Sequence, residues 1–250
     1  MLHYLFSLTL VAVLALVSVA QNVPTLVNLR IEGLKITIFE GTIVTQGHNV
    51  TTPSGGTHHC DGTNNNANPL PGPTCTSTLD DASKANHFTF DGYVSYFLNS
   101  HCGGWLIHGV YSTFTVVDDF SITSIAGDTQ TSTEFWGILL GFEYVSGCQQ
   151  EVQVNGEILY AFNAFNALYF LKLVGQPTAT VGWTTLLFVT DGQTGKPVAG
   201  ATVNGLTSSA NGEISIVFTQ VGTQYLKATK SDAIRSNQIS IKVCSEGGPC

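Results

Sequence analysis

Two apolar runs near the middle of the chain, Phe135–Val145 and Ile158–Leu173, constrain its fold more than any other feature. Each run is apolar at alternate and at intervening positions, which is typical of strands covered on both faces. A polar turn that carries Cys148 separates them. No other part of the chain concentrates enough large side chains to build a core; those of the two runs are Phe135, Trp136, Phe142, Tyr144, Tyr160, Phe162, Phe165, Tyr169 and Phe170. We therefore expect them to be the central strands of a first domain, with the aromatic rings mostly inside.

The first twenty residues indicate secretion. Leu2–Ala20 is apolar without a charged side chain, ends in the small-x-small pattern of Ser18 and Ala20, and is followed at once by polar residues. This pattern predicts a signal peptide over residues 1–20 and an extracellular protein that begins at Gln21. The n-region departs from the signal pattern, because only the amino terminus and His3 can be positive. A membrane anchor is the alternative, but the apolar stretch is short and polar residues follow it at once.

Charge is sparse and unevenly distributed. Only 10% of the residues are charged. Residues 21–177 contain four basic and thirteen acidic residues, a net charge of −9, whereas residues 178–250 contain five basic and four acidic residues, a net charge of +1. An acidic first part argues against nucleic acid and anionic membranes as partners. The partners we expect are cell-wall polysaccharide or an extracellular protein, with no membrane contact after signal cleavage.

Six cysteines are present, which in an oxidising compartment predicts up to three disulfides with fifteen possible connectivities. They are Cys60, Cys75, Cys102, Cys148, Cys244 and Cys250. A bridge between Cys60 and Cys75 would tie the loop between them and stabilise the fold by about 3 kcal/mol in the chain-entropy model. No two cysteines have the close spacing of a zinc site.

The order of elements before Pro177 predicts an α+β, β-rich domain. Residues 26–32 alternate, with Val27, Leu29 and Ile31 on one face and Asn28, Arg30 and Glu32 on the other. Together with residues 35–45 they predict a β-hairpin. Residues 47–73 are rich in turn formers and predict a long irregular loop, which begins with the glycosylation sequon at Asn49.

A short helix and further strands follow. The Ser-x-x-Asp pattern at Ser77 predicts the helix start, with Asp80 as a capping residue. Strands are expected from residue 88 and over residues 119–125. A hairpin, one short helix and a sheet are compatible with a β-grasp-like domain over residues 21–177.

The pattern changes after Pro177 to short alternating strands separated by clear turns. Asp191-Gly192, Asn204-Gly205 and Asn211-Gly212 are turn signals, and strands are expected near residues 186–190, 198–203, 214–218, 225–228 and 239–243. Regularly spaced short strands predict an immunoglobulin-like β-sandwich over residues 178–250.

Several motifs resemble those of a family of fungal secreted proteins of unknown function. They include HHCDGTNNNANPLPGPTC, FTFDG, FWGILLGF and GCQQEV. The first domain of that family is similar to the small C-terminal β-domain of transcobalamin, and the second part resembles Ig-like or prealbumin-like modules. In transcobalamin the vitamin lies against a helical barrel that has no counterpart here, so cobalamin binding does not carry over. On this resemblance Cys60 pairs with Cys148, which would anchor the long loop; Cys244 and Cys250 would close a tail loop.

One segment departs from the family pattern. Between Gly92 and Asp118, family members have a short link, whereas this chain has YVSYFLNSHCGGWLIHGVYSTFTVV. Val94-Ser95 can be encoded by the consensus start of an intron, so one hypothesis is that residues 94–109 are a retained intron; Cys102 would then be absent from the spliced protein. A true insertion loop with a Cys102 bridge is the alternative.

Candidate chemical groups have structural explanations that we favour. His58-His59-Cys60-Asp61 offers metal-ligand types, but adjacent loop residues rarely converge on one ion and Cys60 is expected in a disulfide. The pairs Asp80-Asp81 and Asp118-Asp119 offer carboxylates for glycoside hydrolysis, which requires two of them across a sugar. No nucleophile elbow or phosphate-binding loop is present. Trp105, Trp136 and Trp183 offer sugar-stacking surfaces, though Trp136 lies in a core run.

We therefore expect no catalytic, metal or cofactor site, and a secreted non-catalytic protein that acts by adhesion or ligand binding. A small-ligand carrier and a secreted hydrolase are the alternatives. A carrier should have a mostly apolar pocket with a few polar groups, a hydrolase several titratable groups in one cleft, and an adhesion module an exposed aromatic patch. Binding should be sought on the 47–73 loop and on the face toward the second domain.

Overall fold

The computed structural model describes residues 22–97, 115–248 and 250, without the side chains of residues 94–97 and 115–118. The predicted signal peptide, Cys102, Trp105 and most of the segment 94–109 therefore lie outside the described residues. The described residues are β-rich, with one α-helix and several sheets, as expected for the coarse fold class. Among the described residues, no helix is long and apolar enough to cross a membrane.

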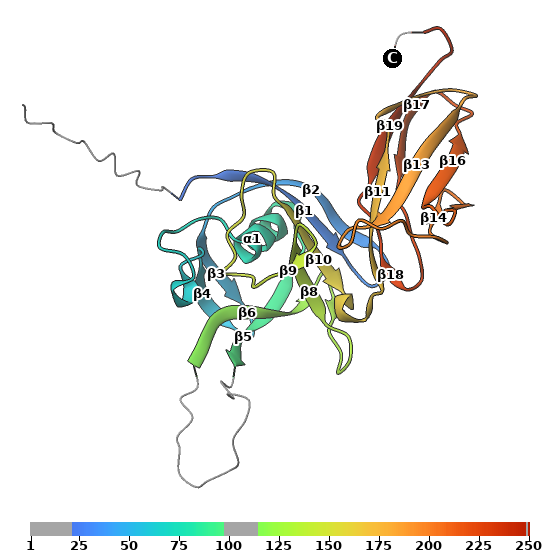
Figure 1. Cartoon of the computed structure of the whole chain (residues 1–250). Coiled ribbons are helices and arrows are strands. Elements are labelled where there is room, and N and C mark those ends of the chain that lie inside the picture. Colours follow the sequence, from blue (N-terminus) through green and yellow to red (C-terminus); the bar gives the residue numbers. More distant parts are fainter. Residues whose placement is uncertain (1–21, 98–114, 249) are drawn as a thin grey trace, which may run out of the picture.

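The N-terminal part runs from β1 to the short 3₁₀ turn η2 (Figure 1). Its elements are β1 (Thr25–Glu32), β2 (Thr37–Thr45), β3 (His48–Thr52), β4 (Gly56–Cys60), η1 (Asn64–Asn66), α1 (Cys75–Asn86), β5 (Phe90–Phe97), β6 (Thr115–Ile125), β7 (Asp128–Thr129), β8 (Trp136–Leu140), β9 (Glu143–Tyr144), β10 (Glu157–Phe162) and η2 (Ala164–Asn166). The main sheet has the order β2-β1-β10-β8-β9, with β1 and β10 parallel and the other neighbours antiparallel. Two smaller sheets, β3-β4 and β5-β6-β7, accompany it.

The predicted hairpin is confirmed and its alternation positions the core. Val27, Leu29 and Ile31 of β1 are buried in one cluster with Leu79 and Ala82 of α1. Because successive side chains of a strand point to opposite faces, Asn28, Arg30 and Glu32 lie on the face of the main sheet away from α1. The C-terminal part contacts that second face around Arg30 and Glu32, as described below.

The helix begins three residues earlier than predicted. Thr74 is the N-cap: its hydroxyl accepts a hydrogen bond from the Ser77 amide (3.1 Å), and Ser77 Oγ accepts one from the Thr74 amide (2.9 Å). This reciprocal pair is a capping box in which Ser77 takes the place usually held by an acidic residue. Asp80 therefore lies within the helix and does not cap it.

The segment 47–73 is more ordered than predicted. His48–Thr52 and Gly56–Cys60 pair as the antiparallel hairpin β3-β4, and η1 follows. Asn68 holds the remainder of the segment, because its side-chain amide donates to the carbonyls of Gly62 (2.8 Å) and Gln149 (2.9 Å). A long loop is expected to be tied down in this way inside a compact structure.

The C-terminal part runs from β11 to β19. Its strands are β11 (Tyr169–Gly175), β12 (Thr178–Thr180), β13 (Thr184–Asp191), β14 (Thr202–Val203), β15 (Leu206–Thr207), β16 (Glu213–Val217), β17 (Gly222–Leu226), β18 (Ala233–Ile234) and β19 (Ile239–Cys244). They form the sheets β16-β13-β11-β18, β12-β19-β17 and β14-β15 around a second buried cluster. Asn204 and Gly205 both have positive φ in the β14-β15 hairpin, as the Asn-Gly signal predicts.

The second apolar run is divided between the two parts. β10 belongs to the main sheet, whereas β11 pairs with β13, so the strand pairing changes between residues 163 and 168. The division into domains at residue 177 stays a prediction, but the C-terminal sheets already include a strand that precedes it. Three of the aromatic residues expected inside are exposed, namely Phe135, Tyr144 and Phe165.

Candidate functional site

The C-terminal part stands beside one end of the main sheet and contacts its second face around Arg30, Glu32 and Glu40 (Figure 1). Glu32 is 1% exposed, and its carboxylate accepts hydrogen bonds from Lys227 Nζ (2.6 Å) and Arg235 Nε (2.8 Å). Glu40 lies on β2, directly opposite Arg30 of β1. Its carboxylate accepts hydrogen bonds from Lys227 Nζ (2.7 Å) and from the Gln238 amide (2.6 Å). These charge-assisted bonds join segments about two hundred residues apart and fix the junction of the two parts.

Phe142 lies at this junction in an unusual backbone conformation. Gly141 (φ +57°) and Phe142 (φ +70°) form the two-residue turn between β8 and β9, because Leu140 pairs with Glu143. A left-handed backbone costs a bulky L-residue about 1–2 kcal/mol. Gly192 lies against the ring, since a Cβ at that position would come within 2.4 Å of it. Gln193 Nε2 donates to the Phe142 carbonyl (3.1 Å), which further holds the turn in place.

Two cations approach the Phe142 ring. The guanidinium carbon of Arg30 lies 5.9 Å from the ring centroid, and Nζ of Lys172, on β11, lies 5.8 Å from it. Both distances are within the range of cation–π attraction. Arg30 is contributed by the main sheet and Lys172 by the C-terminal part, so the ring joins both parts of the chain.

A pocket of about 260 Å³ opens beside this ring. Its floor is the second face of the main sheet, and Phe142, Lys172 and Asn237 form its sides. The complete lining is Asn28, Leu29, Arg30, Glu40, Gly41, Thr42, Phe142, Glu157, Ile158, Leu159, Lys172 and Asn237. A concave site that combines apolar surface with convergent polar groups is the usual form of a small-molecule site, although this pocket is richer in polar residues and slightly smaller than the usual range.

Arg30 is the most deeply buried charged group of the pocket. It is 7% exposed, and among the described residues it makes a single hydrogen bond, from Nη1 to the Arg235 carbonyl (3.1 Å). Its closest carboxylate is Glu32, at 4.0 Å, which already binds two other cations. Burial lowers the pKa of Arg30 below its ordinary value, while the nearby carboxylates of Glu32, Glu40 and Glu157 oppose that shift.

The sequence predicts the side of the first domain on which the pocket lies, but it does not predict the pocket itself. The sequence predicts binding on the face toward the second domain. It places Arg30 only on the strand face opposite Leu29, and it places Phe142 and Lys172 in core runs. The sequence signal that could have indicated the pocket is the pair of charged residues Arg30 and Glu32, on a strand whose other face is buried. The Gly141-Phe142 turn interrupts an apolar run without any polar residue, so it gave no turn signal.

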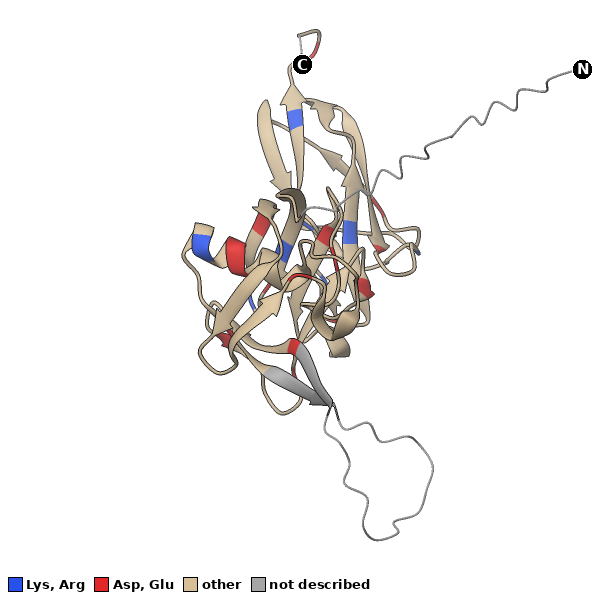
Figure 2. Ribbon diagram, turned by 90° about the vertical axis from the view of Figure 1, so that its left-hand side faces the viewer, with Lys and Arg blue, Asp and Glu red and all other residues tan. Residues whose placement is uncertain are grey.

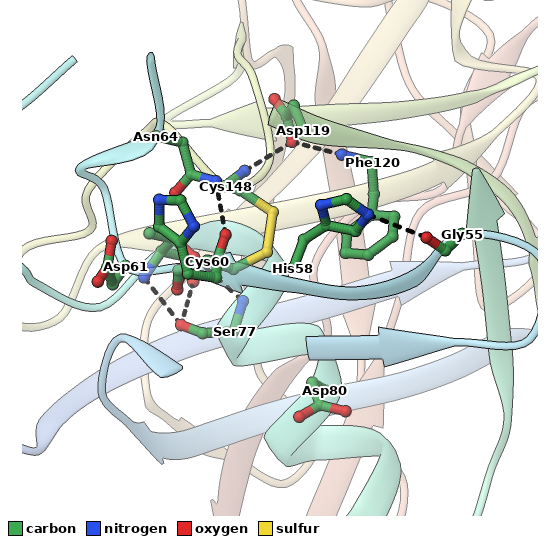
Figure 3. The surroundings of a disulfide bond; sticks show 12 residues. Gly55, His58, Cys60, Asp61, Asn64, Ser77, Asp80, Asp119, Phe120 and Cys148 are labelled. Atoms are coloured by element: carbon green, nitrogen blue, oxygen red, sulfur yellow. Dashed lines mark hydrogen bonds between the residues drawn. A yellow bond between two sulfur atoms is a disulfide. The ribbon is translucent and has the colours of Figure 1, made fainter. Parts of the chain in front are cut away.

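The expected disulfides are present at the predicted positions. Cys60 is bonded to Cys148, not to Cys75, and Cys244 is bonded to Cys250. Beside the first disulfide, Asp119 is buried and accepts from the amides of Cys148 and Phe120, both at 2.8 Å (Figure 3). The Cys60–Cys148 bridge thus anchors β4 to the turn after β9. Cys75 is a buried thiol whose pKa burial raises, so it stays protonated.

The structure also shows the surroundings of the residues that the sequence offers as metal ligands or catalytic carboxylates. Cys60 is bonded to sulfur, so His58-His59-Cys60-Asp61 offers no thiolate ligand. His58 Nε2 lies 3.0 Å from the Gly55 carbonyl, and its ring packs edge-on against Phe120 (Figure 3). Of the two candidate carboxylate pairs, Asp80 and Asp81 lie close together beside His48. The side chain of Asp118 lies outside the described residues, so the pair Asp118-Asp119 stays a prediction.

A different cluster, of His48, Asp80 and Asp81, does come together. His48 Nε2 lies 2.7 Å from Asp80 Oδ2 and 3.8 Å from Asp81 Oδ1. Their ligand atoms are close enough to share an ion. However, Lys84 Nζ occupies the same Asp80 oxygen, at 2.5 Å, so a cation already neutralises this carboxylate. We interpret the cluster as a tie between β3 and α1.

The remaining candidates are the glycosylation site Asn49 and the tryptophans Trp136 and Trp183. Asn49 is exposed on β3, where a glycan would meet solvent. Trp136 is buried, and its indole nitrogen donates to the Asp128 carbonyl (3.0 Å), in agreement with a role in packing. Trp183 is exposed before β13.

Fold and pocket together define a β-rich, disulfide-bonded protein with a small-ligand type of pocket at the junction of its two parts. No protein-family model matches the chain, and no curated protein or solved structure is significantly similar to it. The disulfides are compatible with an extracellular location.

Proposed function

We propose that this is a secreted, non-catalytic binding protein that holds a small molecule in the pocket beside Phe142. The single observation that carries the proposal is the position of this ring. It is held in a backbone conformation that costs energy, with two cations directed at it, at the opening of an apolar pocket. Strained residues that the surrounding structure over-determines cluster at ligand sites. A pocket with few polar groups is what the carrier hypothesis requires.

The finer fold assignment belongs to the same proposal. A parallel central pair of strands with one helix on a single face supports the β-grasp-like interpretation of the N-terminal part. The two larger sheets of the C-terminal part, β16-β13-β11-β18 and β12-β19-β17, lie around one buried cluster, which supports an Ig-like module. The resemblance to secreted fungal proteins with a transcobalamin-like domain is a further expectation of this kind.

The proposal is tested by filling the pocket. Thr42 lines it from β2 and is exposed, so Thr42→Trp should occupy the cavity without removing an internal hydrogen bond. Val44 lies two residues further along the same strand face, outside the pocket and exposed, so Val44→Trp is the matched control. In a thermal-shift screen of small molecules, hits should stabilise wild type and Val44→Trp but not Thr42→Trp. A screen in which every hit also stabilises Thr42→Trp would refute the proposal.

Adhesion is the second candidate, favoured by an exposed apolar face on the C-terminal sheet. Val174, Leu186, Phe188 and Val217 are each 42–50% exposed on β11, β13 and β16. Val174 lies opposite Phe188, and Leu186 follows on the same face. Few charges interrupt the ribbon in this part of the chain (Figure 2). Binding of the secreted protein to isolated cell-wall polysaccharide that Phe188→Ser abolishes and Thr42→Trp leaves intact would favour adhesion over the pocket.

A further inference from the structure

The charges of the pocket indicate which ligand it takes. We propose that the pocket binds a small organic anion, with an apolar body on the sheet floor and a carboxylate-type head group between Arg30 and Lys172. This inference rests on the proposed function, because it names the ligand class of the same pocket.

The first step concerns the two cations. Arg30 and Lys172 both line the pocket, and both lie within 6 Å of the centroid of the Phe142 ring. Water screens a charge less in a partly buried site than at the surface, so a cation there gains more from a nearby anion. Among the described residues, Lys172 has no carboxylate within 4.0 Å, and Arg30 has only Glu32, at that limit. An anion bound in the pocket would supply a close partner to both cations.

The second step concerns the carboxylates, which do not supply that anion. Glu32 binds Lys227, Arg235 and Thr37, and Glu40 binds Lys227 and the Gln238 amide. Their oxygens are thus committed to the junction of the two parts. The ring of Phe142 offsets part of the positive charge, but cation–π attraction is worth only about 0.5–2 kcal/mol.

The third step concerns Glu157, the remaining acidic residue of the lining. It is exposed and makes no ion pair with a described residue, so water solvates its charge at the rim. Arg30 is buried and cannot be solvated in the same way. A buried charge without a close partner costs more free energy than an exposed one, so the cations decide the preferred ligand charge.

The fourth step concerns size and polarity. The pocket holds about 260 Å³, which is below the range of about 300–1,000 Å³ for drug-sized ligands. Leu159 lies opposite Arg30 in the register of β10 and β1 and contributes an apolar surface beside the charge. A ligand of one or two rings with one acidic group matches both features. Guanidinium groups bind carboxylates through paired hydrogen bonds, and Arg30 makes only one hydrogen bond within the described chain.

The test compares two probes that differ only in charge, 2-naphthoate and 2-naphthamide, by isothermal titration calorimetry. Wild type should bind 2-naphthoate at least tenfold more tightly than 2-naphthamide. Lys172→Met removes the charge and keeps the apolar stem, so it should weaken 2-naphthoate binding about tenfold and leave 2-naphthamide unchanged. Lys172→Arg should retain the preference for the anion.

The control variant is Lys242→Met, because Lys242 is an exposed lysine on β19 outside the pocket. It should bind both probes as wild type does. Circular dichroism of each variant checks that the fold is kept, and Lys172→Arg separates loss of charge from loss of packing if Lys172→Met is unstable.

The possible failures are distinguishable. Equal affinity for the two probes, lost for both in Thr42→Trp, would overturn the anion inference and leave the pocket as a binding site. Tighter binding of 2-naphthylmethylammonium than of 2-naphthoate would also overturn the inference, because Glu157 would then govern the charge preference. Failure of both probes to bind at millimolar concentration, or binding that Thr42→Trp leaves intact, would overturn the proposed function as well.

Discussion

The carboxylate of Glu32, on the second strand face of β1, lies 2.8 Å from Nε of Arg235, which follows β18. Arg235 also donates through Nη2 to the carbonyls of Gly33 and Ile36, so one guanidinium holds the whole β1-β2 turn. The two residues are in direct contact although they are 203 positions apart in sequence. Through Glu32 and Arg235, the main sheet and the C-terminal sheets are held in the orientation that creates the pocket.

Glu32→Gln should therefore destabilise the protein. The substitution keeps the shape of the side chain but leaves Arg235 without a carboxylate and Lys227 with Glu40 only. Breaking a buried ion pair from one side costs about 3–5 kcal/mol; since both cations are partly exposed, we expect about 3 kcal/mol. Urea unfolding measures the loss. Glu143→Gln, an exposed residue of β9, should change stability by less than about 0.5 kcal/mol. A similar small effect for both variants would contradict this role of Glu32.

The two disulfides should contribute unequally. Cys60–Cys148 closes a loop with a sequence separation of 88, and Cys244–Cys250 one with a separation of 6. In the chain-entropy model these correspond to about 4–5 and about 2 kcal/mol. Replacing both cysteines of each pair by alanine and unfolding in urea gives the two values. The reverse order would show that the entropic account does not apply to this chain.

The sequence predicted those features of the fold that local patterns control. The alternation of Val27, Leu29 and Ile31 correctly predicted the buried face of β1, and Asn204-Gly205 correctly predicted a hairpin. In both cases the residues that carry the pattern also make the structure, by burial or by backbone conformation. The pairing of Cys60 with Cys148 was expected only from the family resemblance, because the composition leaves fifteen connectivities open.

The pocket depends on contacts that no local pattern contains. Arg30 and Glu32 have the appearance of a solvated strand face, and their burial follows from residues at positions 227 and 235. Phe142 looks like part of a continuous strand, because its turn lacks the usual Asn or Asp. The β3-β4 hairpin was missed for a related reason: its strands consist of His, Asn, Thr and Gly, and only the pairing across the hairpin identifies them.

Tyr160→Phe should leave stability unchanged or raise it. Tyr160 is fully buried, and its hydroxyl has the Thr76 hydroxyl as its polar neighbour. The geometry of this contact is poor, so neither hydroxyl has a well-formed hydrogen bond to a described residue. A buried hydroxyl with one weak contact has lost its hydration without full compensation, so its removal costs little. In Tyr144→Phe, by contrast, the bond to the Ala164 carbonyl (3.0 Å) is lost, and we expect a cost of about 1 kcal/mol. If Tyr160→Phe is the more destabilising of the two, the Tyr160 hydroxyl has a partner in solution.

The tie between β3 and α1 should make stability depend on pH. The hydrogen bond to Asp80 raises the pKa of His48 above its ordinary value of 6.5. Burial alone would raise the pKa of Asp80, but hydrogen bonds from His48 and Lys84 bring it below its ordinary value of 3.8. The imidazolium–carboxylate pair therefore stabilises the fold fully below pH 6.5, and this contribution is lost as the pH rises through the higher pKa that His48 has in the fold. The Asp80 contribution is present above pH 3.8 and is lost only as the pH falls through its lowered pKa in the fold.

His48→Gln measures this contribution directly. The variant should be less stable than wild type at pH 5.5, and the difference should shrink as the pH is raised to 8.5, because neutral His48 no longer pairs with a charge. His87→Gln is the control for the substitution itself, because His87 is exposed at the end of α1 and forms no ion pair with a described residue. Urea unfolding at several pH values gives both curves. A difference for His48→Gln that stays constant from pH 5.5 to 8.5 would mean that packing, and not the charge of His48, joins β3 to α1.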